Sequence, residues 1–139
     1  ADGSTCHVVA SEDDITHHAP AGLGSRWVLQ ELISGPFEYA ASLLVDGGQI
    51  LDVIGTVYEC EGDARSRRQH YTTRDNDIAV MREFLRDYSG ICSMSYRIRD
   101  SGAISIHRIS PYVSADFAVD VPRPLGRALL LRMNTLQTS

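Results

Sequence analysis

The basic side chains of this sequence are the first guide to its chemistry, because all thirteen are arginines and none is lysine. A chain without lysine lacks the compact ammonium group that Schiff-base chemistry, a phosphate-loop lysine or a lysine general base requires. Guanidinium groups instead form forked hydrogen bonds with phosphates and carboxylates. Arg65, Arg67 and Arg68 stand close together in the sequence and could clamp such an anion, whereas the alternative is an exposed loop whose charges only keep the protein soluble.

Histidine and cysteine offer little for a metal site or a nucleophile. Of the five histidines, His17 and His18 are adjacent and cannot share one helix face, and the others fall in different expected elements, so no zinc site is predicted. The three cysteines are far apart and odd in number, which indicates reduced thiols in a reducing compartment. Cys6 or Cys92 could pair with His107 as a nucleophile, but Cys92 lies in an apolar run and is predicted to be a core residue.

Length and composition favour one compact domain over residues 1–139. Apolar residues make up 43% of the chain and charged residues 22%, so a core can form and wholesale disorder is not expected. The net charge of −5 opposes binding to a polyphosphate backbone, so nucleic acid is not an expected partner. The sequence shows no signal peptide and no apolar run long enough for a membrane span, so a cytoplasmic protein without a membrane partner is expected.

The elements that must position these residues follow from turn signals and hydrophobic spacing. Asp and Gly at 46–48 and at 100–102 supply the backbone freedom that a tight turn needs, and Ser11 before acidic residues is typical of a helix start. The expected elements are a buried strand at 27–33, paired strands at 38–45 and 49–58, an exposed loop at 59–74, a helix at 77–88, paired strands at 91–99 and 103–109, and a helix at 125–136. They predict an α+β fold, in which an antiparallel sheet of both hairpins and the 27–33 strand carries the two long helices on one face.

The order of these elements and several local motifs resemble the C-terminal half of an ATP-grasp domain, of the kind found in carboxylate-amine ligases. Residues 27–36 resemble the hinge strand that receives adenine, and the turn at 46–48 resembles the hairpin that follows it. Residues 3–5 resemble the end of the glycine-rich loop that covers the phosphates. Residues 90–96 and 106–112 resemble the paired strands that normally end in Glu-x-Asn-Pro-Arg. The resemblance covers most of the chain and implies the ATP-grasp C-terminal subdomain as the fold.

This resemblance implies an adenine-nucleotide site, with ATP as the cofactor, at Gln30, Glu31, Leu32, Ile33 and Glu38. The Glu31 carbonyl would accept a hydrogen bond from the adenine amino group, and the Ile33 amide would donate one to the ring. Glu38 resembles the carboxylate that accepts hydrogen bonds from the ribose hydroxyls, although it stands one residue later than the usual spacing.

The sequence departs from the family at the expected metal site. Ser95, Arg108 and Ser110 stand where the family has acidic or amide ligands for Mg²⁺, and Tyr112 stands at the position of the closing arginine. Mg²⁺ requires oxygen ligands in octahedral geometry, and a guanidinium group would repel the cation. No Mg²⁺ is therefore expected on this chain alone, and no catalytic residue is assigned.

Together these features predict a degenerate ATP-grasp-like domain that binds an adenine nucleotide and does not catalyse a reaction by itself. Two alternatives stay open. The chain could be one piece of an ATP-dependent carboxylate-amine ligase that a missing N-terminal segment or a partner subunit completes. It could also be an unrelated α+β binding module.

Overall fold

The computed structural model describes residues 6–61, 64–113 and 115–138. Its contacts divide the chain into two compact units, Ala1–Leu32 and Ile33–Ser139, called unit 1 and unit 2 below. A unit as small as unit 1 rarely buries enough surface to fold alone. The expected single domain over residues 1–139 therefore stays a prediction.

Unit 1 contains the helix α1 (Glu12–His18) and the short 3₁₀-helix η1 (Gly24–Arg26). The Ser11 hydroxyl accepts a hydrogen bond from the Asp14 amide, and the Asp14 carboxylate accepts one from the Ser11 amide, so the predicted helix start is confirmed as a capping box.

The buried strand predicted at residues 27–33 is wrong. These residues form no strand, and Val28, which would have faced a core, is 80% exposed. A strand is stable only when a neighbouring strand pairs with its N–H and C=O groups, and the described part of unit 1 holds no second strand. The high β-propensity of this segment could not supply that neighbour.

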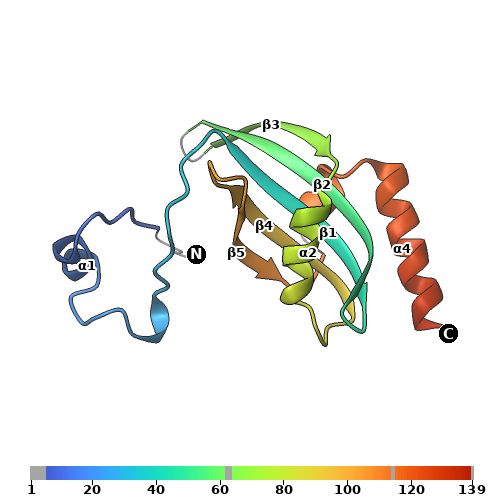
Figure 1. Cartoon of the computed structure of the whole chain (residues 1–139), viewed down its shortest axis with the longest axis horizontal. Helices are drawn as coiled ribbons and strands as arrows, with labels where there is room; N and C mark the ends of the chain where they lie inside the picture. Colours follow the sequence, from blue (N-terminus) through green and yellow to red (C-terminus); the bar gives the residue numbers. More distant parts are fainter. Residues whose placement is uncertain (1–5, 62–63, 114, 139) are drawn as a thin grey trace. The chain divides into compact units, whose positions relative to one another are not determined.

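Unit 2 is built on one antiparallel sheet, and the predicted α+β class is confirmed (Figure 1). Its strands follow the spatial order β3-β2-β1-β4-β5. They are β1 (Phe37–Asp46), β2 (Gln49–Glu61), β3 (Ala64–Tyr71), β4 (Gly90–Ile98) and β5 (Ile104–Ser110). The β1–β2 and β4–β5 hairpins occur where the turn signals predicted them, and both glycines of the first turn, Gly47 and Gly48, have positive φ angles.

The exposed loop predicted at 59–74 is also wrong. β2 continues to Glu61, and β3 pairs with it in antiparallel register. Few apolar residues are present in β3 because it is an edge strand, where charged side chains are tolerated and prevent pairing with other chains. Arg65, Arg67 and Arg68 stand in β3, but their side chains lie outside the described part of the structure, so anion binding by this cluster stays a prediction.

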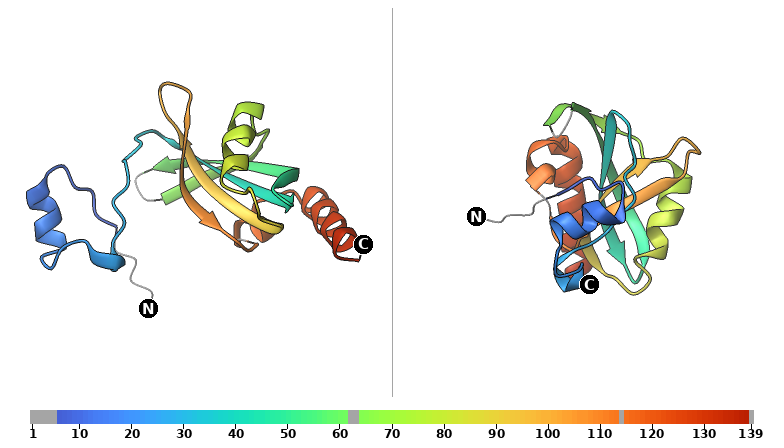
Figure 2. Two further views of the ribbon diagram at one scale, coloured as in Figure 1. Left: turned by 60° about the horizontal axis from the view of Figure 1, so that its bottom comes forward. Right: turned by 90° about the vertical axis from the view of Figure 1, so that its left-hand side faces the viewer.

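Helices cover both faces of the sheet, which corrects the expectation that they share one face. On the α2 face, Met81 and Leu85, from α2 (Asp75–Glu83) and the turn after it, pack against a cluster that includes Leu43 and Cys92. On the α4 face, residues of α3 (Ala115–Val119), α4 (Arg123–Gln137) and the segment between them pack against Leu44, Ile54 and Ile91. Figure 2 shows α2 and α4 on opposite sides of the sheet. The physical reason is the alternation of side chains along β1, which buries Leu43 on one face and Leu44 on the other.

The helix predicted at 77–88 is shorter than expected, because α2 ends at Glu83. Beyond that residue the Leu85 amide donates to the Arg82 carbonyl, and the Tyr88 amide donates to the Leu85 carbonyl, in tighter turns than an α-helix makes. This change of period exposes Phe84 and keeps Leu85 buried.

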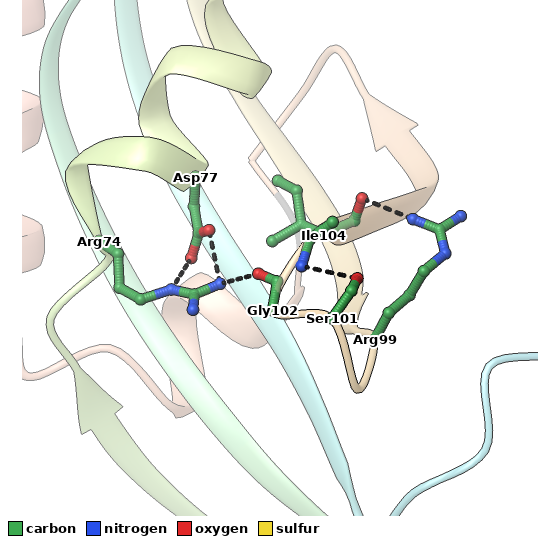
Figure 3. A network of polar contacts seen from close by, with 7 residues as sticks. Arg74, Asp77, Arg99, Ser101, Gly102 and Ile104 are labelled. Carbon is green, nitrogen blue, oxygen red and sulfur yellow. Dashed lines mark hydrogen bonds and ion pairs between the residues drawn. The ribbon is translucent and has the colours of Figure 1, made fainter.

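A partly buried ion pair joins the start of α2 to the β4–β5 turn (Figure 3). The Arg74 guanidinium donates through Nε and Nη2 to the two carboxylate oxygens of Asp77, at 2.8 and 2.7 Å. Arg74 Nη2 also donates to the Gly102 carbonyl at 3.0 Å. Asp77 is almost fully buried, with 3% of its side chain exposed, whereas Arg74 is 42% exposed.

We expect Asp77→Ala to lower the free energy of unfolding by about 2 kcal/mol, because it removes the partner of a charged hydrogen-bonding group. Asp75→Ala is the matched control, since Asp75 lies in the same helical turn and is exposed, and its effect should stay within about 0.5 kcal/mol. Urea denaturation followed by circular dichroism measures both variants. Equal effects in the two variants would contradict a special role for the buried pair.

Candidate functional site

The α4 face of the sheet changes from apolar to polar along its strands. Next to the apolar cluster under α4, Ser42 on β1 is the partner of Ser93 on β4, and Ser93 is the partner of Ser110 on β5. Side chains of directly opposed residues lie side by side on one face of a sheet. Three serines thus form a row across three strands, and because Ser42 and Ser110 are buried, this row is a polar floor rather than an open surface.

The next row away from α4 ends in a positive charge. Ala40 on β1 is the partner of Ser95 on β4, and Ser95 is the partner of Arg108 on β5. Ser95 is half-buried and Arg108 is exposed. This row therefore presents a hydroxyl and a guanidinium group to a ligand that approaches the α4 face.

A carboxylate and two basic groups meet in the row after that. Glu38 on β1 keeps only 14% of its side chain exposed; one carboxylate oxygen lies 3.8 Å from Arg97 Nη2 and the other 3.8 Å from His107 Nε2. Arg97 also donates to the carbonyls of Ile33 and Gly35, at 3.3 and 2.9 Å. Arg97 therefore holds both Glu38 and the backbone segment that leads into β1.

A β-bulge brings His107 to this cluster. The register between β4 and β5 shifts so that Ser95 opposes Arg108 while Tyr96 opposes Ile106, which leaves His107 without an opposed residue. Strict alternation would put His107 and Arg108 on opposite faces, whereas a bulge re-aims a side chain. His107 can therefore approach Glu38 on the face that carries Arg108.

Sequence reasoning did not assign Arg97 or His107 to this site. The sequence placed Arg97 only within the strand predicted at 91–99, and it offered His107 only as a partner for a cysteine. No local signal could have found them, because β1 lies between β2 and β4 and the contact joins residues about sixty positions apart.

The residues expected to contact adenine fall on either side of the unit boundary. Gln30, Glu31 and Leu32 are exposed residues of unit 1, whereas Ile33 is a half-buried residue of unit 2. Gly35, which follows this segment, has a φ of 140°, a backbone conformation that favours glycine. Adenine contacts at residues 30–33 stay a prediction.

The three positions at which the resemblance implied metal ligands lie together on the α4 face. Ser95 and Arg108 oppose each other, and Ser110 lies two residues beyond Arg108 on the same strand. Hydroxyl and guanidinium groups do not fit Mg²⁺, which requires carboxylate, amide or similar oxygen ligands. Over the described ranges, no group of three or more His, Cys, Asp or Glu side chains is placed to hold a metal ion.

Tyr112 lies just after β5 and interacts with this end of the face. Hydrogen bonding with Ser110 and with the Arg108 guanidinium lowers the pKa of the Tyr112 phenol. The Tyr112 phenol therefore interacts with the Arg108 guanidinium. The resemblance implied an arginine at position 112, and the tyrosine found there contacts an arginine instead.

A cysteine nucleophile paired with His107 does not form from Cys92. Cys92 opposes Leu43 inside the α2-face core, while His107 contacts Glu38. Burial raises the pKa of the Cys92 thiol to about 11, so the reactive thiolate is scarce at neutral pH. The prediction of Cys92 as a core residue is confirmed.

The described helices include none long and apolar enough to cross a bilayer.

Comparison with known proteins returned structural likeness of low similarity. No family model and no curated protein matches this sequence. The crystal structure of the macrocyclase MdnB from Microcystis aeruginosa MRC superimposes with a TM-score of 0.49 at 17% sequence identity. The match covers 90% of this chain, and the chain spans 46% of the length of that macrocyclase chain.

Proposed function

We propose that unit 2 binds the ribose and phosphate portion of an adenine nucleotide on the polar half of the α4 face, without a metal ion. The observation that carries the proposal is the placement of Glu38, Arg97 and His107 in one row and of Arg108 in the next. A carboxylate can accept hydrogen bonds from vicinal hydroxyls, and a guanidinium group matches the geometry of phosphate oxygens. The sheet thus offers complementary groups to both parts of the ligand.

Each residue has a distinct role in this proposal. Glu38 would accept from a ribose hydroxyl, and Arg97 would hold Glu38 and the carbonyls of Ile33 and Gly35 in place. Arg108 would contact the phosphates and supply the charge that Mg²⁺ supplies in other nucleotide sites. Adenine contacts at residues 30–33 are what the sequence resemblance implies, and the proposal for unit 2 does not depend on them.

The same residues argue against phosphoryl transfer by this chain. Phosphoryl transfer depends on positioned cations that neutralise the developing charge, normally metal ions and a lysine. The chain contains no lysine, and the face carries hydroxyl groups where metal ligands would stand. We therefore propose nucleotide binding without catalysis.

We expect ATP to bind in the presence of EDTA, and Arg108→Ala to weaken that binding about tenfold, which corresponds to about 1.4 kcal/mol. Isothermal titration calorimetry measures both affinities. The matched control is Arg82→Ala, because Arg82 is an exposed arginine on α2, on the other side of the sheet. Equal affinity in the wild type and in Arg108→Ala, or binding that requires Mg²⁺, would contradict the proposal.

Adenosine tests the base and ribose contacts separately from the phosphates. Chemical-shift changes on titration should centre on residues 30–38, and 2′,3′-dideoxyadenosine should produce smaller changes at Glu38 because it lacks both vicinal hydroxyls. Changes confined to β3 would instead favour the arginine cluster on that strand as the binding site.

A second candidate function rests on the exposed apolar side chains of unit 1. Val28, Leu29 and Leu32 are exposed within a segment of high β-propensity that forms no strand. This pattern supports the alternative that the chain is one piece of a ligase, completed by another segment or subunit that pairs with residues 27–33. Hydrogen-exchange protection of these amides in a longer form of the protein, and its absence in this chain, is the result expected from that alternative.

A further inference from the structure

An apolar groove of about 580 Å³ lies along α4, on the side of the helix that does not face the sheet. Phe117 from α3 and Val121 contribute to one wall, and Leu130 and Leu131 of α4 contribute to the other. Leu129 is fully buried against the sheet, whereas Leu130 is 40% exposed. Leu129 thus belongs to the core, whereas Leu130 and Leu131 line the groove, which is a separate apolar surface.

A glycine forms part of the lining of this groove. A Cβ atom at Gly126 would lie 3.4 Å from the Phe117 ring and 3.6 Å from Val121 Cγ1. Both are ordinary van der Waals distances, so Gly126 packs directly beside Phe117 and Val121 and adds no polar group to the lining of the groove. An exposed apolar surface bordered by charged groups is typical of a protein interaction site.

The charge of α4 indicates what the groove could bind. Arg123 and Arg127 border the groove one helical turn apart, and both are exposed. Neither forms a salt bridge or a side-chain hydrogen bond within the described ranges. Over its 15 residues α4 carries three arginines and no acidic residue, although acidic residues outnumber basic ones in the whole chain by 18 to 13. The positive charge of this helix is therefore a local feature of the surface.

We propose that this groove binds an amphipathic helix of a partner protein that has leucine-like residues on one face and carboxylates one turn apart beside them. Helix-in-groove binding uses apolar anchors that recur every three or four residues, and Arg123 and Arg127 match carboxylates at the same spacing. A second copy of this chain is a poor occupant, because two α4 helices would bring only arginines together as charged groups. The proposal does not depend on nucleotide binding.

Fluorescence anisotropy with a labelled synthetic peptide tests the proposal on the whole chain. The probe is a helical peptide with leucines on one face and glutamates one turn apart beside them; a second peptide replaces every glutamate with lysine. We expect saturable binding of the acidic peptide, at least about tenfold weaker binding of the basic peptide, and a similar loss for the double variant Arg123→Glu/Arg127→Glu. The basic peptide should recover affinity for that double variant.

Matched controls separate charge pairing from a general effect of net charge. Arg82→Glu/Arg86→Glu changes the charge equally at the end of α2 and in the turn after it, and it should leave peptide binding unchanged. Leu131→Ser should weaken binding without unfolding the protein, because Leu131 is exposed, and circular dichroism verifies the fold. The proposal is overturned if the acidic peptide shows no saturable binding, if the α2 variant weakens binding as much as the α4 variant, or if sedimentation shows that a second copy of the chain covers the groove.

Discussion

Leu129→Ala is expected to lower the free energy of unfolding by about 3 kcal/mol, since truncation of a fully buried leucine removes apolar contacts and leaves a cavity. Leu129 has no exposed surface and packs with Leu44, Ile54, Ile91 and Phe117 on the α4 face. The size of the loss measures how firmly α4 is attached to the sheet. Urea denaturation followed by far-ultraviolet circular dichroism measures the free energy of unfolding.

Leu130→Ala is the matched control for this experiment, because Leu130 is the next residue of the same helix and is partly exposed. Its expected effect is below about 1 kcal/mol. A large loss in Leu129→Ala with a small loss in Leu130→Ala supports helices on both faces of the sheet. Similar losses in the two variants, or none in Leu129→Ala, would contradict packing of α4 on this face.

Gly48→Ala is expected to destabilise unit 2 by about 3 kcal/mol, the second large effect. Gly48 has a φ of 79°, which costs an L-residue about 1–2 kcal/mol. A Cβ atom there would also collide with the carbonyl oxygen of Arg86 and lie 2.8 Å from its carbonyl carbon. Because both atoms belong to the backbone, the turn must move, which adds overpacking strain and threatens the hydrogen bond from the Gly48 amide to Tyr88.

Gly47→Ala separates the two causes. Gly47 also has a positive φ, of 52°, but a Cβ atom there would meet nothing within 4 Å. It should therefore cost only about 1 kcal/mol, the conformational part of the effect. Thermal or urea denaturation measures the free energy of unfolding of both variants. Equal losses would show that the close approach of the Arg86 carbonyl to Gly48 contributes little to the cost.

Local signals in the sequence were sufficient for the hairpins and for the start of α1. A turn is expected at Asp46, Gly47 and Gly48 because positive φ angles are available mainly to glycine. At the start of α1, Ser11 and Asp14 accept hydrogen bonds from backbone amides that have no partner within the helix. These requirements involve residues that are neighbours in sequence, so no tertiary contact is needed to recognise them. The α+β class with an antiparallel sheet follows from the hairpins.

The distribution of helices over two faces was also present in the sequence, but it was not recognised. Leu43, Leu44 and Val45 form a continuous apolar run, which is typical of a strand buried on both sides. The charged composition of β3, in contrast, is typical of both a loop and an edge strand. Only its pairing with β2 distinguishes these two structures.

The tertiary structure alone decided the composition of the candidate site. Glu38 was selected by resemblance, but its neighbours Arg97 and His107 depend on the central position of β1 and on the bulge in β5. Both are non-local features, because strand order and register are set by pairing energies and packing summed over the whole sheet. The segment 27–33 illustrates the converse. Its side chains favour a strand, yet no strand forms, because a strand requires a hydrogen-bonded neighbour that local sequence cannot supply.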